Sequence, residues 1–245
     1  MSEERQARID LTAALRSASR MGLGEGVCNH FSMEIPGAPG RFLVNPQGLH
    51  WSEVTPADLV VLDADGNKVA GRHDVEPTAF FIHAALHRGK PSARCVLHTH
   101  MPYATALTVI HGGRLDWCSQ NSLRFYGRAA YDDDYNGLAL DPEEGARMCA
   151  ALANADVLFL ANHGVIATGP AIAMAFDDLY YLERACMVQV LGASMGRPLR
   201  IVAENIAALT ARQMAQESQQ AQLHFAALKR ILDRDEPGWR GTGPQ

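Results

Sequence analysis

The stretch from Arg94 to His100, Arg-Cys-Val-Leu-His-Thr-His, joins a short apolar run to two histidines. Successive residues of a strand point to opposite faces, so His98 and His100 should project from the same face, about 7 Å apart at Cα. Two imidazoles at that separation can share one cation, because histidine is the commonest ligand of transition metals. The pair alone could equally be two unrelated surface or core histidines. A metal site therefore needs support from elsewhere in the chain.

A third histidine, His163, stands in the triplet Asn-His-Gly directly after the apolar run 157–160. A turn at the end of this second predicted strand would expose its imidazole at a sheet edge. Considered alone, such a histidine could be a hydrogen-bonded structural residue. Together with His98 and His100 it predicts a three-imidazole site with open coordination positions, the arrangement of catalytic rather than structural zinc.

Glu76 is the fourth candidate for this site. It directly precedes Pro77, and proline favours the first position of a helix. An acidic side chain at a helix start is favoured by the helix dipole, so a structural role is one interpretation. The functional interpretation places a carboxylate near the metal, where it could ligate the ion or move a proton.

The chain outside these motifs predicts a mixed sheet flanked by helices on both faces. Strand-like runs separated by turn residues cluster in the first third, whereas helices separate the later strands, which is typical of α/β folds. Apolar residues recur with helical spacing in several longer segments. We expect helices near residues 3–21, 77–89, 102–110, 142–153, 170–195 and 204–232, and strands near residues 28–35, 41–44, 59–63, 68–69, 94–99, 157–160 and 165–167.

Length and composition favour one globular domain over residues 1–235, followed by a flexible tail over 236–245. A net charge of -5 argues against nucleic acid or an anionic membrane as a partner and leaves a small-molecule substrate. No apolar run resembles a signal peptide or reaches membrane-spanning length. Five cysteines without a CxxC motif suit reduced thiols. We therefore expect a cytoplasmic protein.

Three other patterns offer weaker signals. His83 and His87 are four residues apart on a predicted helix but lack the glutamate of an HExxH motif, so we expect them on a solvated helix face. Glycines 22, 24 and 26 do not form GxGxxG and follow a helix, which argues against nucleotide binding. The acidic triplet 132–134 is expected in a solvated loop.

Five short motifs occur in an order that resembles the class II aldolase/adducin family, and the likeness extends from about Arg8 to Met195. The combination is specific, because HxH and NHG follow a glutamate at suitable distances and fall at the predicted structural places. The motifs are Asn29-His30-Phe31-Ser32, Asn45-Pro46-Gln47-Gly48, Glu76, His98-Thr99-His100 and Asn162-His163-Gly164.

The resemblance implies that His98, His100 and His163 bind zinc or a similar ion and that Glu76 is the acid/base. It also implies a three-layer α-β-α fold with a mixed, mainly antiparallel central sheet, assembled as a homotetramer with sites at subunit interfaces. Adducin-like head domains share this fold but lack the metal ligands. The intact ligand set therefore favours an enzyme over a non-catalytic interaction module.

Departures from the family pattern bear on the substrate. Members that act on sugar phosphates carry two serines before the glutamate, where this chain has Asp74 and Val75. Valine supplies no hydroxyl donor, and an aspartate in a low-dielectric pocket would repel a phosphate dianion by several kcal/mol. We therefore expect a substrate without phosphate. The residues expected to bind it at the matching positions are Asn29, His30, Gln47 and Gly48.

The position of a tyrosine that donates a proton in some family aldolases falls near Gln120 in this chain. Tyr126 and Tyr131 are the nearby substitutes. We include Gln120 and Tyr131 in the expected substrate site.

These expectations define a divalent-metal-dependent carbon-carbon lyase. It would act by retro-aldol cleavage or decarboxylation through a metal-stabilised enediolate or enolate. Three imidazoles favour Zn²⁺, although Mn²⁺, Co²⁺ or Fe²⁺ would also fit. Two rivals remain: a non-haem iron oxygenase that uses two of the histidines with Glu76 as a facial triad, and a non-catalytic interaction module.

Overall fold

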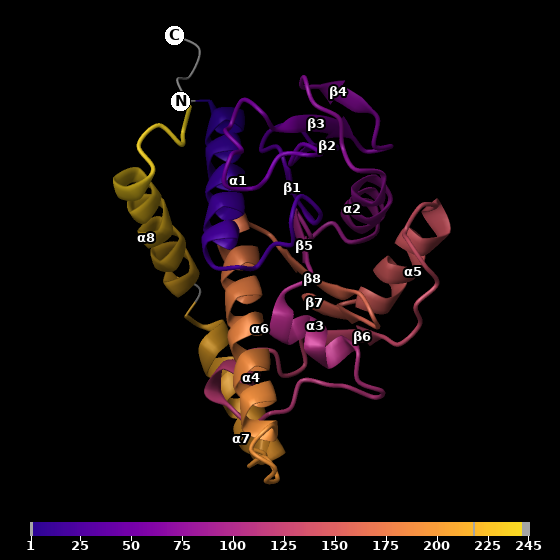
Figure 1. The fold of residues 1–245 in the computed structure, drawn as a ribbon, viewed down its shortest axis with the longest axis vertical. Coiled ribbons are helices and arrows are strands. Elements are labelled where there is room, and N and C mark those ends of the chain that lie inside the picture. The colour runs from indigo at the N-terminus through magenta and orange to yellow at the C-terminus, as the bar shows by residue number, and fades with distance from the viewer. Residues whose placement is uncertain (1, 218, 242–245) are drawn as a thin grey trace.

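A computed structural model describes residues 2–217 and 219–241, and these residues form one eight-stranded sheet in the order β4-β3-β2-β1-β5-β8-β7-β6 (Figure 1). Neighbouring strands are antiparallel except for the parallel pair of β6 and β7, so the prediction of a mixed, mainly antiparallel sheet is confirmed. The strands are β1 (His30–Glu34), β2 (Arg41–Val44), β3 (Val60–Asp63), β4 (Lys68–Ala70), β5 (Cys95–Thr99), β6 (Ala129–Asp132), β7 (Val157–Leu160) and β8 (Gly164–Gly169).

Helices cover both faces of the sheet, which gives the expected three-layer architecture. In Figure 1, α1, α6 and α8 lie on one side of the strands, and α2 and α5 lie on the other. The helices are α1 (Glu3–Arg20), α2 (Pro77–Gly89), α3 (Pro102–Thr108), α4 (Gln120–Leu123), α5 (Pro142–Leu152), α6 (Ile172–Ala193), α7 (Glu204–Ala215) and α8 (Gln219–Asp235).

The central strands are apolar on both faces because helices bury both. On β5, Cys95 and Leu97 join the core beneath α1 and α6, whereas Val96 joins the smaller core beneath α2 and α5. Alternation along the strand then places His98 on the α2 side of the sheet, two residues beyond Val96. The alternation of side chains along β5 therefore decides that His98 faces α2 rather than α1 and α6.

The C-terminal part of the chain differs from the expectation in two places. The single helix expected over 204–232 is two helices, because α8 turns back to bury Phe225, Leu228 and Leu232 in the core beneath α1 and α6. In the described part of the expected flexible tail over 236–245, Trp239 is packed and only 3% exposed, whereas Pro237, Gly238 and Arg240 are exposed. Residues 242–245 lie outside the described residues.

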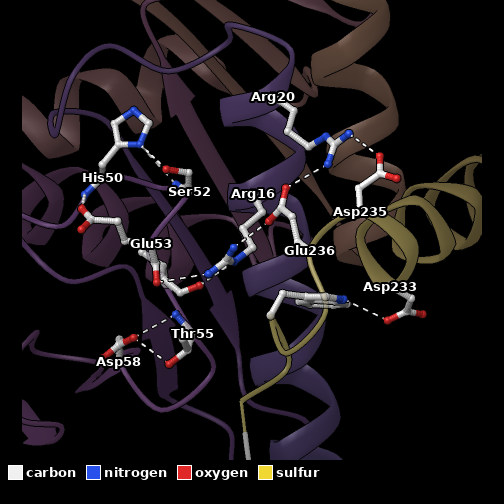
Figure 2. A network of polar contacts seen from close by, with 12 residues as sticks. Arg16, Arg20, His50, Ser52, Glu53, Thr55, Asp58, Asp233, Asp235 and Glu236 are labelled. Atoms are coloured by element: carbon white, nitrogen blue, oxygen red, sulfur yellow. Dashed lines mark hydrogen bonds and ion pairs between the residues drawn. The ribbon is translucent and has the colours of Figure 1, made fainter.

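Ion pairs explain why this segment stays against α1 (Figure 2). Arg16 lies 2.6 Å from the carboxylate of Glu236, and Arg20 lies 2.9 Å from the same carboxylate and 2.7 Å from Asp235. The indole nitrogen of Trp239 donates to Asp233 at 2.9 Å. These contacts hold the start of the tail against α1.

Candidate metal centre and acid/base site

His98, His100 and His163 gather at one end of β5, β7 and β8. Their ligand atoms all lie within 4.8 Å of one another. The ring centroids are 4.7 Å apart for His98 and His163 and 4.8 Å apart for His100 and His163. Three nitrogen donors from two separate parts of the chain therefore meet in one place, with His98 buried and the other two rings partly open to solvent.

The Asn-His-Gly turn brings His163 to the other two rings. Asn162 has φ 56°, a left-handed conformation that asparagine tolerates, and it makes the tight turn between β7 and β8. A Cβ atom on Gly164 would lie 2.5 Å from the backbone oxygen of Thr99 and 2.7 Å from the ring of His100. Glycine is therefore required here so that β8 can begin beside His100.

Hydrogen bonds to Nδ1 orient two of the imidazoles. Nδ1 of His98 lies 3.1 Å from the carbonyl oxygen of Val165, and Nδ1 of His100 lies 2.6 Å from the carboxylate of Glu25. Both partners accept, so both Nδ1 atoms carry hydrogen, and in a neutral ring this leaves the lone pair on Nε2. The two Nε2 atoms face each other at 3.2 Å. This arrangement suits two ligands of one cation, each held by an outer hydrogen bond.

Burial keeps His98 and His163 neutral. It lowers the pKa of His98 and lowers the pKa of His163 to about 4. At neutral pH both rings can therefore present a lone pair to an ion without first losing a proton. The donor set fits a divalent metal with borderline-soft preference, since imidazole suits zinc, copper, iron and nickel.

Glu76 is connected to the three histidines through His30 and is not one of the clustered ligands. It is the N-cap residue of α2 but makes no capping hydrogen bond with its side chain. Its carboxylate instead accepts from the hydroxyl of Thr78 and lies 3.5 Å from Nε2 of His30. The His30 ring is 4.9 Å from that of His98. Glu76 is thus one imidazole away from a metal ligand.

His30 occupies a different place from the one expected for a substrate-binding residue. It is only 3% exposed, and its two ring nitrogens face His83 and the Glu76–Thr78 pair. Register explains this position, because His30 of β1 pairs directly with His98 of β5. The side chain therefore lies behind Glu76 rather than on an open surface.

The expectation for His83 and His87 is wrong, because α2 turns both toward the sheet. His83 is 3% exposed and lies 2.8 Å from Nδ1 of His30. His87 is partly buried, stacks on Phe42 at 4.0 Å between centroids and lies 2.6 Å from the hydroxyl of Ser32. Polar partners on β1 satisfy these rings, so their burial does not leave unpaired groups.

Acid should destabilise the fold through His87. Burial lowers its pKa to about 4, against about 6.5 in the unfolded chain. The unfolded state therefore binds the proton more readily, so the stability is full above pH 6.5 and is lost as the pH falls toward 4. We expect His87→Phe, which can still stack on Phe42, to remove on the order of 2 kcal/mol of the difference in unfolding free energy between pH 7 and pH 4.5.

Urea denaturation at the two pH values measures this difference. His50→Phe, which makes the same substitution at an exposed histidine, is the matched control. Equal pH dependence in the parent and in His87→Phe would show that His87 takes up a proton as readily in the fold as outside it.

Asn29 and the loop containing Gln47 and Gly48 contact segments that belong to the site. Asn29, at φ 72°, accepts through its side-chain oxygen from the backbone nitrogens of Glu25 and His100. Its buried Nδ2 has no partner among the described residues. The loop containing Gln47 and Gly48 is exposed, and the Gln47 nitrogen donates to the backbone oxygen of Asp74 at 2.8 Å. This bond fixes the loop beside the segment that leads to Glu76.

The structure does not bring the remaining expected residues to the histidines. Gln120 lines a cavity of about 460 Å³ with residues of α6 and the α7–α8 connection. The hydroxyl of Tyr126 donates to Glu204. Tyr131 lines a different cavity, of about 510 Å³, which reaches Asn162 but contains none of the three clustered histidines, and its hydroxyl accepts from the Leu115 nitrogen.

Four hydrogen-bond partners of the site residues are not among the residues that the sequence predicts for the site: Glu25, Thr78, Ser32 and the carbonyl of Val165. The only local signal was the position of Thr78, which stands two residues after Glu76 and can return a hydroxyl to it. The other three contacts depend on how distant segments pair. They are visible only once the register of β1, β5 and β8 is known.

Comparisons with known proteins agree with this fold. Residues 9–190 match the family model for the Class II Aldolase and Adducin N-terminal domain. A protein described as an aldolase class 2 protein, PA3430 of Pseudomonas aeruginosa, is 36% identical over 97% of this chain and 93% of its own length. The decarboxylase NovR of Streptomyces niveus is 32% identical over 90% of this chain and 83% of its own length.

A solved structure extends the likeness to three dimensions. The aldolase II superfamily protein from Pseudomonas syringae has a TM-score of 0.91 and 32% identity, covering 98% of this chain and 97% of that one. The fold and the histidine cluster define an aldolase-type α/β protein with a candidate metal centre. This chain belongs to the class II aldolase/adducin family. No helix among the described residues is long and apolar enough to cross a membrane.

Proposed function

We propose that this protein is a divalent-metal-dependent carbon-carbon lyase that acts on a small hydroxy-carbonyl or hydroxy-carboxylate substrate. The observation that carries the proposal is the convergence of three imidazoles, with a carboxylate that is not itself among the clustered ligands one imidazole away. Such a site separates ion binding from proton transfer. The family supports an enzyme, and the name of the relative NovR supports decarboxylation alongside aldol cleavage.

His98, His100 and His163 would hold the ion, for which Zn²⁺ is the first choice and Mn²⁺, Co²⁺ and Fe²⁺ are alternatives. When bound, the ion supplies a Lewis acid that stabilises the negative charge on a substrate oxygen as the carbon-carbon bond breaks. Glu76 moves the proton, since its carboxylate lies 3.5 Å from His30, whose ring is 4.9 Å from that of His98, and it is not one of the clustered ligands. The unpaired Nδ2 of Asn29 would donate to a substrate oxygen.

We further propose that the working form is a homotetramer, as the family resemblance implies. Large apolar side chains on the C-terminal half of α6 and on α7 support association, because monomers rarely expose many of them together. They include Leu191, which is 50% exposed, and Leu209, which is 43% exposed.

Part of the argument against a phosphorylated substrate is wrong. The Asp74 side chain is 83% exposed and lies 2.9 Å from the ammonium of Lys68, so its charge is screened and does not act in a low-dielectric pocket. The other part stands, because Val75 offers no hydroxyl to a phosphate. A substrate without phosphate therefore remains our proposal, and it now rests on missing donors rather than on repulsion.

The decisive experiment begins with metal analysis of the purified protein. The metal-loaded enzyme is then incubated with panels of hydroxy-aldehydes and hydroxy-aromatic carboxylates, and the release of aldehyde or carbon dioxide is measured. We expect cleavage of at least one class, abolished by a chelator and restored by the metal. Oxygen consumption with an oxidised product would contradict the lyase and favour the iron oxygenase.

The same panel of substrates tests whether the preferred substrate lacks a phosphate group. For a matched pair, we expect the unphosphorylated substrate to have the higher kcat/KM, by about tenfold or more, since one missing charge-assisted hydrogen bond is worth about 1.5 kcal/mol or more. Asp74→Asn serves as the control, and it should change this ratio little because the charge is exposed. A phosphorylated substrate that is cleaved much faster would show that donors other than residues 74 and 75 hold the phosphate.

A further inference from the structure

A chain of hydrogen bonds runs beneath α2 and begins at a group that can only accept. Nδ1 of His87 lies 2.7 Å from the carbonyl oxygen of Ala93, which itself is buried. Nδ1 must therefore carry a hydrogen. Burial lowers the pKa of His87 to about 4, so the ring is neutral at pH 7 and its Nε2 has a lone pair.

Each following bond takes its direction from this anchor. The Ser32 hydroxyl lies 2.6 Å from Nε2 of His87 and must donate to it. The Ser32 oxygen is then free only to accept, and it does so from Nδ1 of His83. Nε2 of His83 therefore has a lone pair and accepts from Nδ1 of His30, 2.8 Å away.

We propose that Ser32, His83 and His87 are positioning residues that fix His30 as its Nδ1–H tautomer and so direct an acceptor nitrogen toward Glu76. Nε2 of His30 lies 3.5 Å from the Glu76 carboxylate and 3.3 Å from the Thr78 hydroxyl oxygen. That hydroxyl already donates to Glu76. The nitrogen lone pair and the carboxylate thus face each other with no hydrogen between them.

The sequence builds this chain by combining two periodicities. His30 and Ser32 are two residues apart on β1, so both point to the α2 face of the sheet. His83 and His87 are four residues apart on α2, so both point back to the strand. Phe42, stacked on His87 at an interplanar angle of 16°, closes the far end.

The consequence for Glu76 rests on the proposed function. A proton that the carboxylate receives from the substrate would then face the lone pair on Nε2 of His30 rather than an N–H group. If His30 were the Nε2–H tautomer, it would instead donate to the carboxylate and compete for the same oxygen. The tautomer itself does not depend on any reaction, so it can be tested without a substrate.

The test is nitrogen NMR at pH 7.5 of the purified protein, labelled with ¹⁵N and ¹³C in its histidines. The chemical shifts of the two ring nitrogens show which of them carries the hydrogen. We expect Nδ1–H for His30, His83 and His87. In His87→Phe the Ser32 hydroxyl loses its acceptor and can donate to His83 instead. His83 and His30 should then both change to Nε2–H.

Two further variants keep the test decisive if His87→Phe fails to fold. Ser32→Ala breaks the chain with the loss of one oxygen and should also free His30 from Nδ1–H, whereas Ser32→Thr retains the hydroxyl and should preserve it. Phe42→Leu removes the ring that stacks on His87 but no hydrogen bond, and it should leave all three tautomers unchanged. The proposal is overturned by Nε2–H at His30 in the parent protein, or by an unchanged His30 in Ser32→Ala.

Discussion

His98→Ala should reduce the affinity for Zn²⁺ by about two to three orders of magnitude. Four-ligand zinc sites contribute about 10–16 kcal/mol, so one ligand accounts for roughly 3–4 kcal/mol. His98 is the most buried of the clustered histidines, and its Nδ1 is held by the Val165 carbonyl, which leaves Nε2 for the ion. Titration calorimetry and metal analysis of the purified variant measure the loss.

Two controls separate ligand loss from general damage. His50→Ala removes an exposed histidine outside the cluster and should bind Zn²⁺ as the parent protein does. Glu25→Gln keeps the shape but weakens the hydrogen bond to His100, and it should cost about 10–100-fold, as outer contacts of metal ligands do. Full zinc binding by a folded His98→Ala protein would mean that these rings are not the ligands.

The strand-end histidines could be found from sequence because their geometry is local. The alternation of a strand puts His98 and His100 on one side without any knowledge of the neighbours, and a turn after an apolar run exposes His163. The three-layer fold could also be predicted, since the order of strands and helices restricts the possible arrangements. These features depend on short stretches of chain.

The buried histidines of α2 could not be placed in this way. Spacing shows that His83 and His87 share a helix face, but not whether that face meets water or the sheet. The answer depends on His30 and Ser32, some 50 residues earlier, and on the register that pairs His30 with His98. This polar face of α2 can be buried because His30 and Ser32 on β1 form hydrogen bonds with its histidines.

Asp74 shows the same limitation for charge. The sequence allows Asp74 to be compared only with the residues that family members carry at the same position. That comparison predicts a place in the substrate pocket. The structure pairs it with Lys68, six residues earlier on β4, and leaves both in solvent. The distance between a charge and its partner, rather than the identity of the residue, decides whether it repels a substrate.

Glu76→Gln should lower kcat by about 10²–10⁴-fold while leaving the metal content unchanged. Glutamine has the shape of glutamate but cannot take up or release a proton at neutral pH, and general acid/base groups contribute rate factors of that size. The metal should remain because Glu76 is not among the three clustered ligands. Steady-state kinetics on the substrate found by the panel, with metal analysis of the same sample, measure both quantities.

The expected separation of activity from metal binding is what distinguishes a proton carrier from a ligand. A ligand would lose metal and activity together, as His98→Ala should, whereas a proton carrier loses activity alone. Glu143→Gln, at an exposed glutamate in the first turn of α5, makes the same chemical change without contact to the site and should keep full activity. If Glu76→Gln loses its metal, Glu76 belongs to the coordination sphere, and proton transfer must be assigned to another group.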